Sequence, residues 1–116
     1  MSKEAPKVAE LEVITQTYEL TREITERVRG FPRDLRFVLG DRMLNTVYSV
    51  LDVLIEARYS SARGPLLARS NILLEQLRFQ IRLAVDVNLL NARQYEFLAE
   101  RVRNVGRMVG GWIKSL

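Results

Sequence analysis

The chain has 116 residues, of which 47% are hydrophobic and 28% are charged, so it has the size of one domain and enough apolar side chains for a core. It contains no cysteine and no histidine, which excludes disulfides, zinc sites built from those ligands, and catalytic triads that need either residue. The formal net charge of +4 is uneven, because residues 1–57 carry eight basic and ten acidic side chains whereas residues 58–116 carry ten and four.

The chain begins with a polar segment. Residues 1–7 lack the apolar stretch of a secretory signal, and we expect them to be flexible. No run of apolar residues approaches the length of roughly 18 that a membrane span needs, so no membrane association is predicted. The cytoplasm is therefore the expected location.

Two helices are predicted in the first half of the chain. Apolar side chains at three- and four-residue spacing, including Leu11 and Tyr18, predict a helix over residues 8–29. A second helix is predicted over residues 32–59. Its apolar stripe includes Phe37 and is wider than one neighbouring helix requires.

Two more helices are predicted in the second half. The third covers residues 65–87 and has a main apolar stripe for the core. A second stripe of Ile72, Phe79 and Leu83 lies on another side of the same helix. The fourth covers residues 92–114 after a tight connection, and short connections place consecutive helices antiparallel.

The last helix has clear signals at both ends. Asn91 can cap it, and Gln94 can complete a capping box from the third helical position. Near the other end, Gly106 and Gly110 remove side chains from one face. Close approach of another helix, within the protomer or across an interface, is one interpretation, and fraying of a glycine-weakened helix is the other. Trp112 requires burial and favours close packing.

These elements predict an all-α fold: a single domain over residues 1–116, arranged as an up-down-up-down antiparallel four-helix bundle. The broad apolar faces of the second and third helices suggest packing beyond one bundle, and a small domain gains stability from oligomerisation.

Arginine dominates the candidate binding residues, since fifteen of the 18 basic side chains are arginine and its planar fork suits phosphate and carboxylate. An arginine-rich genome or surface ion pairs would give the same composition. Arg78 and Arg82 share a helix face and could both contact a ligand. Glu75 is three residues before Arg78 and Asp86 is four residues after Arg82, so each arginine could instead form an ion pair within the helix. The full set of candidate nucleic-acid-binding or partner-binding residues is Arg58, Arg63, Arg69, Arg78, Arg82, Arg93, Arg103, Arg107 and Lys114.

Aromatic and acidic residues give weaker signals. Only Tyr59 is predicted to be exposed beside these cations, so base stacking has little support. The remaining tyrosines, Tyr18, Tyr48 and Tyr95, are assigned to the core or its boundary. The first helix carries an acidic strip that is either solvated or faces a basic neighbouring subunit.

No enzyme, cofactor or metal site is predicted. A di-iron bundle needs histidine ligands that the chain lacks. The second to fourth helices show no paired carboxylates for acid–base chemistry, the only candidates being Asp52, Glu56, Glu75 and Asp86.

Several segments resemble a known superfamily. Residues 31–42 (FPRDLRFVLGDR) and the last helix, from NARQY at 91–95 to GRMVGGWI at 106–113, resemble four-helix-bundle proteins encoded within bacterial rRNA intervening sequences. Residues 77–84 (LRFQIRLA) and the GGWI ending are similar to one branch, the accessory variability determinant (Avd) of diversity-generating retroelements. The resemblance covers about 85 residues from Phe31 onward, and the first helix matches only by pattern.

The Avd resemblance implies a non-catalytic, positively charged homopentameric barrel with a central channel. Such a barrel binds the reverse transcriptase of the same element, together with RNA and possibly DNA through backbone contacts, and supports mutagenic cDNA synthesis. This chain lacks a long basic C-terminal tail, which such proteins carry. The alternative is a structural oligomer of the rRNA intervening-sequence type that has protein partners only.

Overall fold

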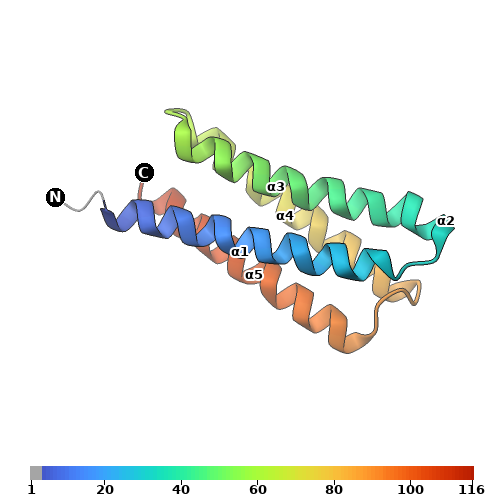
Figure 1. Cartoon of the computed structure of the whole chain (residues 1–116). Coiled ribbons are helices and arrows are strands. Elements are labelled where there is room, and N and C mark those ends of the chain that lie inside the picture. The colour runs from blue at the N-terminus through green and yellow to red at the C-terminus, as the bar shows by residue number, and fades with distance from the viewer. Residues whose placement is uncertain (1–3) are drawn as a thin grey trace.

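Four long antiparallel helices form the computed structural model, which describes residues 4–116 and the side chains of residues 8–116 (Figure 1). The long helices are α1 (Glu4–Arg29), α3 (Asp41–Tyr59), α4 (Arg63–Asp86) and α5 (Ala92–Lys114), and the short elements α2 (Arg33–Leu35) and η1 (Arg36–Gly40) join α1 to α3. Each long helix packs on two others, in the cyclic order α1, α3, α4, α5. The predicted all-α, up-down-up-down bundle is confirmed.

The helix ends differ slightly from those predicted. α1 begins at Glu4, before the predicted start at Val8. Residues 1–3 of the segment predicted to be flexible lie outside the described residues. α4 begins at Arg63, so that Pro65 falls in its first turn, where the missing backbone N–H has no helical partner to lose. None of the helices in residues 4–116 combines the length and apolar character that a membrane span requires.

The predicted single helix over residues 32–59 is interrupted by η1, a π-helical turn over Arg36–Gly40. A side chain at Gly40 would lie 2.7 Å from Cγ1 of Val28, so the absence of a Cβ lets η1 approach α1. The π turn contains more residues per turn than an α-helix and shifts the register of the apolar stripe. Phe37, predicted to lie on that stripe, is therefore 65% exposed.

The buried face of α1 differs from the predicted one in the first part of the helix, whereas Ile24 and Val28, also predicted to face the core, are buried. Leu11 and Tyr18 are 48% and 53% exposed, whereas Val13, Thr17 and Leu20 are at most 1% exposed. Thr17 fits the core because its Oγ1 donates a hydrogen bond to the carbonyl oxygen of Val13 at 2.7 Å. The predicted stripe was built from apolar residues and therefore did not include Thr17. For this reason it was shifted around the helix in the first part of α1.

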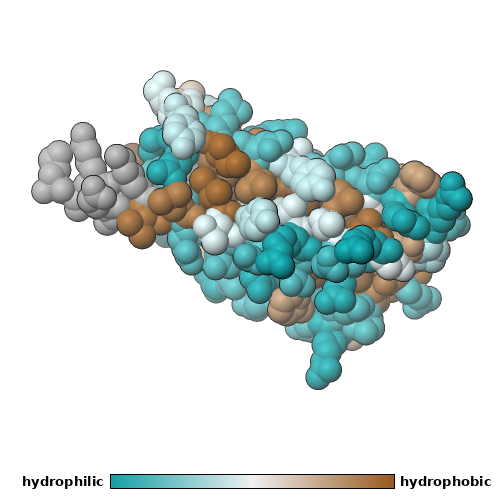
Figure 2. Space-filling model, in the orientation of Figure 1, coloured by the Kyte–Doolittle hydropathy of each residue, from teal (hydrophilic) through white to brown (hydrophobic). Residues whose placement is uncertain are grey.

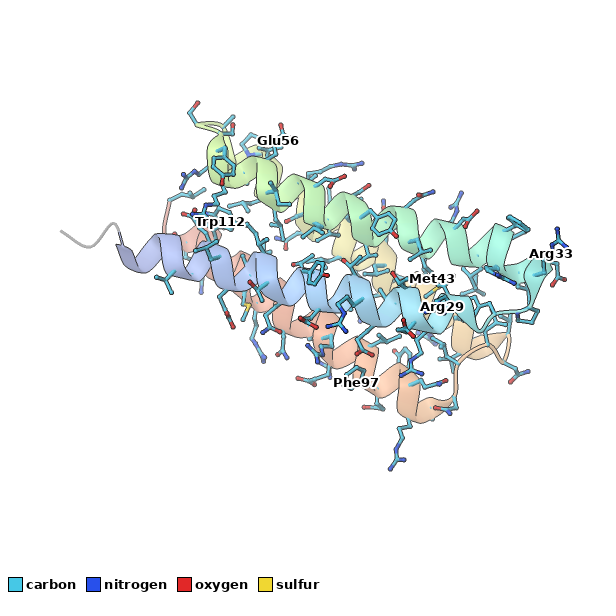
Figure 3. The ribbon with its side chains drawn as sticks, in the orientation of Figure 1. Arg29, Arg33, Met43, Glu56, Phe97 and Trp112 are labelled. Carbon is cyan, nitrogen blue, oxygen red and sulfur yellow. The ribbon has the colours of Figure 1, made fainter. Side chains whose placement is uncertain are left out.

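The predicted capping box of α5 is confirmed. The amide of Gln94 donates to Asn91 Oδ1 at 2.8 Å, and the amide of Asn91 donates to Gln94 Oε1 at 2.9 Å. At the other end of α5, Trp112 is 6% exposed and packs in the core, as predicted. Figure 3 labels this residue close to the first turns of α1.

The glycines of α5 do not meet another helix within the protomer. A Cβ added at Gly106 or Gly110 would have no atom within 4 Å, so the predicted close approach is wrong for the protomer itself. The physical reason is the helical register: Val105, Val109 and Trp112 carry the buried face, and the glycines lie off it. Close approach across an interface stays a prediction.

Candidate nucleic-acid interface

Two of the predicted cations come together on the α4/α5 side. Arg78 and Arg103 line one surface cavity of about 300 Å³, and Gly106 leaves that cavity open. Each guanidinium is held by a glutamate of its own helix. Arg78 Nη2 donates to Glu75 Oε2 at 2.6 Å, and Arg103 Nη2 donates to Glu100 Oε1 at 2.5 Å.

These two ion pairs set the electrostatics of the cavity. The hydrogen bond to Glu75 raises the pKa of Arg78, and the hydrogen bond from Arg103 lowers the pKa of Glu100. Both pairs are exposed, so they add little to stability and exchange readily with other partners. An anion that binds here has to compete with both glutamates.

Three predicted cations lie where α3 passes into α4. Arg63 is an anchor: its Nη1 donates to Glu10 Oε2 at 3.2 Å and its Nη2 donates to the carbonyl oxygen of Arg58 at 3.1 Å. The Glu10 side chain is only 5% exposed, so this pair ties α1 to the connection. The guanidinium of Arg58 lies 5.7 Å from the ring centroid of Tyr59, and Arg69 is exposed on α4.

The other four predicted residues are distributed over the bundle. Arg82 lies near the end of α4 and Arg93 at the start of α5, so both are toward the end where these helices connect (Figure 1). Lys114 ends α5 at the opposite end, and Arg107 donates to Asn104 Oδ1. Within the described side chains, none of the four lies within 4.0 Å of a carboxylate, so the Arg82–Asp86 alternative is not realised.

Exposed aromatic rings beside cations are more frequent than predicted. Tyr59 is 80% exposed as expected, but Phe79 and Phe97 are also 58% and 42% exposed. Arg78 lies 5.6 Å from the centroid of Phe79, and Arg101 lies 5.0 Å from that of Phe97. The prediction that only Tyr59 has this arrangement is wrong, because an aromatic residue in a helical pattern does not reveal which side of the helix the core covers.

The tyrosines assigned to the core or its boundary are divided. Tyr95 packs against the core. Tyr18 and Tyr48 are 53% and 43% exposed and line a shallow cavity between α1 and α3. They belong to the outer surface of the bundle.

Two residues of interest were absent from the predicted set, namely Phe97 and Arg101. The sequence contains a signal for them, because Arg93, Phe97 and Arg101 follow one another at intervals of four and so share a face of α5. Figure 3 shows the Phe97 ring on the outside of that helix. The described residues contain no group of three or more acidic side chains placed to hold a metal ion.

Comparison with known proteins places the chain in a family. Residues 12–116 match the bAvd-like family, which is most of the chain. The chain belongs to the bAvd-like family. The resemblance to Avd is thus confirmed. The match begins at residue 12 and so includes most of α1, a helix that the sequence motifs had connected to the family only by its apolar pattern.

One solved structure has the same fold as this bAvd-like chain. It is the crystal structure of a protein of unknown function from the S23 ribosomal protein family of Bacteroides thetaiotaomicron. The TM-score is 0.84 with 14% sequence identity, and the alignment covers 91% of this chain and 98% of the other. No curated protein matches the chain.

Proposed function

We propose that this chain is a non-catalytic accessory protein of a diversity-generating retroelement. In this proposal it forms a basic homo-oligomer that binds reverse transcriptase and template RNA or DNA and supports mutagenic cDNA synthesis. The observation that carries the proposal is the bAvd-like match over residues 12–116. The distribution of charged and of exposed apolar side chains over the bundle supports the proposal independently.

The charge is concentrated on one side of the bundle. Helices α4 and α5 carry nine basic and four acidic side chains, and these two helices pack on each other. The helices α1 and α3 come from the half with more acidic than basic groups. A basic side of this kind attracts a phosphate backbone without reading bases.

Apolar residues on the outside support self-association. Figure 2 shows a brown apolar band along the α1 and α3 side of the molecule. The large exposed side chains of these helices include Leu11 at 48%, Tyr18 at 53% and Ile55 at 41% exposure. Contiguous apolar surface on a soluble chain marks a contact site.

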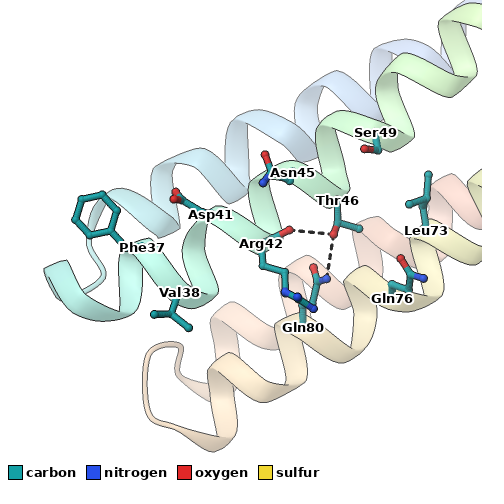
Figure 4. A pocket seen from close by; sticks show the side chains of 10 residues that line it. All are labelled: Phe37, Val38, Asp41, Arg42, Asn45, Thr46, Ser49, Leu73, Gln76 and Gln80. Carbon is teal, nitrogen blue, oxygen red and sulfur yellow. Dashed lines mark hydrogen bonds between the residues drawn. The ribbon is translucent and has the colours of Figure 1, made fainter.

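Two more exposed apolar side chains lie beside a mainly polar cavity of about 460 Å³ between α3 and α4 (Figure 4). They are Phe37 and Val38 of η1, which are 65% and 72% exposed. On its floor, Gln80 Nε2 donates to Thr46 Oγ1 at 2.9 Å, while Gln80 Oε1 is buried with no hydrogen-bond partner in the described chain. Exposed apolar side chains at two separate places on one protomer suit head-to-tail contacts, which form a ring where the rotation between subunits closes.

The same surfaces favour the alternative, a structural oligomer of the rRNA intervening-sequence type with protein partners only. The two functions differ in nucleic-acid binding. We therefore propose measuring the affinity of the protein for template-repeat RNA at 50 and 200 mM salt, with capture of purified retroelement reverse transcriptase in parallel. Steep loss of RNA affinity with salt and capture of the enzyme support the retroelement function, since each phosphate contact adds about 0.7–0.9 to the log–log slope. Failure of both supports the alternative.

A further inference from the structure

A groove between α1 and α5 brings cations from two helices to an exposed aromatic ring. The cavity has a volume of about 490 Å³ and is lined by Glu23, Arg27, Asn91, Arg93, Gln94 and Phe97. Arg101 lies one turn further along α5, with its guanidinium carbon 5.0 Å from the Phe97 centroid. The guanidinium of Arg101 lies over the ring, which is still 42% exposed.

The groove keeps its positive charge, unlike the cavity beside Arg78. Glu23 is its one acidic lining residue, and Arg27 Nη2 lies 3.9 Å from Glu23 Oε2. Among the described side chains, Arg93 and Arg101 have no carboxylate within 4.0 Å. The lining residues, two arginines and one glutamate, carry a net charge of about +1 at neutral pH, and Arg101 adds a further positive charge beside Phe97.

Two backbone N–H groups at the start of α5 are already bonded, because Asn91 and Gln94 satisfy each other's through the capping box. The side chains of the groove offer guanidinium groups for anions and the ring of Phe97 for a flat, apolar surface. An anion that carries exposed flat rings fits both features.

We propose that this groove binds single-stranded nucleic acid, with an unpaired base stacked on Phe97 and the flanking phosphates held by Arg27, Arg93 and Arg101. The site rests on the scaffold function proposed above, and it adds a preference for unpaired strands. Bases on aromatic rings and phosphates on a basic groove are the usual combination in single-strand binding without sequence preference. In a duplex the base faces are already stacked, so Phe97 has nothing to accept.

The test compares Phe97→Leu with the matched control Tyr48→Leu, which removes a ring of nearly equal exposure on α3, away from the basic helices α4 and α5. Affinities of the full chain are measured for an unstructured oligouridine, for an RNA duplex, and for heparin as a polyanion without bases. Circular dichroism confirms that each variant is folded, since both rings are exposed. Arg93→Gln is measured over a salt series.

We expect Phe97→Leu to weaken oligouridine binding roughly five- to hundredfold, the effect of removing a stacking ring, and to leave heparin binding unchanged. Tyr48→Leu leaves both affinities unchanged. Arg93→Gln lowers the salt slope for the single strand by about 0.7.

Three results overturn the site. One is an oligouridine affinity of Phe97→Leu equal to that of the unmodified chain. That result is compatible with the scaffold function but places the nucleic-acid contacts outside this groove. Another is equal loss of heparin and oligouridine, which shows a polyanion site without stacking. The third is absence of all nucleic-acid binding by the unmodified chain, which overturns the proposed function as well.

Discussion

Two glycines in this bundle respond oppositely to the same substitution. A Cβ at Gly40 would lie 2.7 Å from Val28 Cγ1, whereas a Cβ at Gly106 would have no atom within 4 Å. Carbon atoms pack best at roughly 3.5–4.0 Å, so Gly40→Ala has to move η1 and α1 apart by about 1 Å. Such overpacking costs about 1–3 kcal/mol, offset by up to about 1 kcal/mol of helix propensity.

We therefore expect Gly40→Ala to lower the free energy of unfolding by about 1–2 kcal/mol, and Gly106→Ala to raise it by about 0.5–1 kcal/mol. The measurement is urea unfolding followed by circular dichroism, repeated at two protein concentrations so that any contribution from subunit association is separated. A change of the same sign for both variants would refute the packing argument. Loss of stability in Gly106→Ala at high protein concentration only would place that glycine in a subunit contact.

Further predictions concern the ion pairs and the tryptophan. Arg63→Ala leaves the buried Glu10 carboxylate without its partner and should lower the free energy of unfolding by about 2 kcal/mol. This is less than for a fully buried ion pair, because Arg63 is partly exposed. Adding Glu10→Gln to the Arg63→Ala chain should restore part of the lost free energy. Trp112→Phe should change the free energy of unfolding by no more than about 1 kcal/mol. The cost of the lost ring volume is offset because the substitution also removes a buried indole N–H that has no hydrogen-bond partner. In an NMR titration, Glu100 should titrate below its ordinary pKa of 4.5, and Arg103→Gln should bring the pKa back toward it. Since the folded-state pKa is lowered, the small stabilisation by this pair is present above the unfolded pKa and is lost as the pH falls through the folded one.

The fold was predictable because helical spacing and capping are local properties. The capping box at Asn91 and Gln94 was recognisable from residue types, and both hydrogen bonds are present. The π turn before α3 was not, because it depends on how closely Gly40 packs against Val28, residues that meet only in the folded bundle.

The candidate surface was predictable only in part. The sequence offered both a free Arg78 and a Glu75–Arg78 pair, and side-chain geometry selects the pair. The α1/α5 groove needs Arg27 and Phe97, which come from opposite ends of the sequence and meet through the cyclic packing of the helices. Helical spacing along α5 was enough to place Arg93 and Phe97 on one face. That Arg27 of α1 lies beside them depends on tertiary packing.

The measurement that tests the central claim most directly is sedimentation velocity of the protein with fluorescent single-stranded RNA at low salt. We expect a species whose mass is a multiple of the 13.4 kDa chain, with RNA that co-sediments at low salt and is released at high salt. A 13.4 kDa monomer that sediments separately from the RNA at every salt concentration would contradict it.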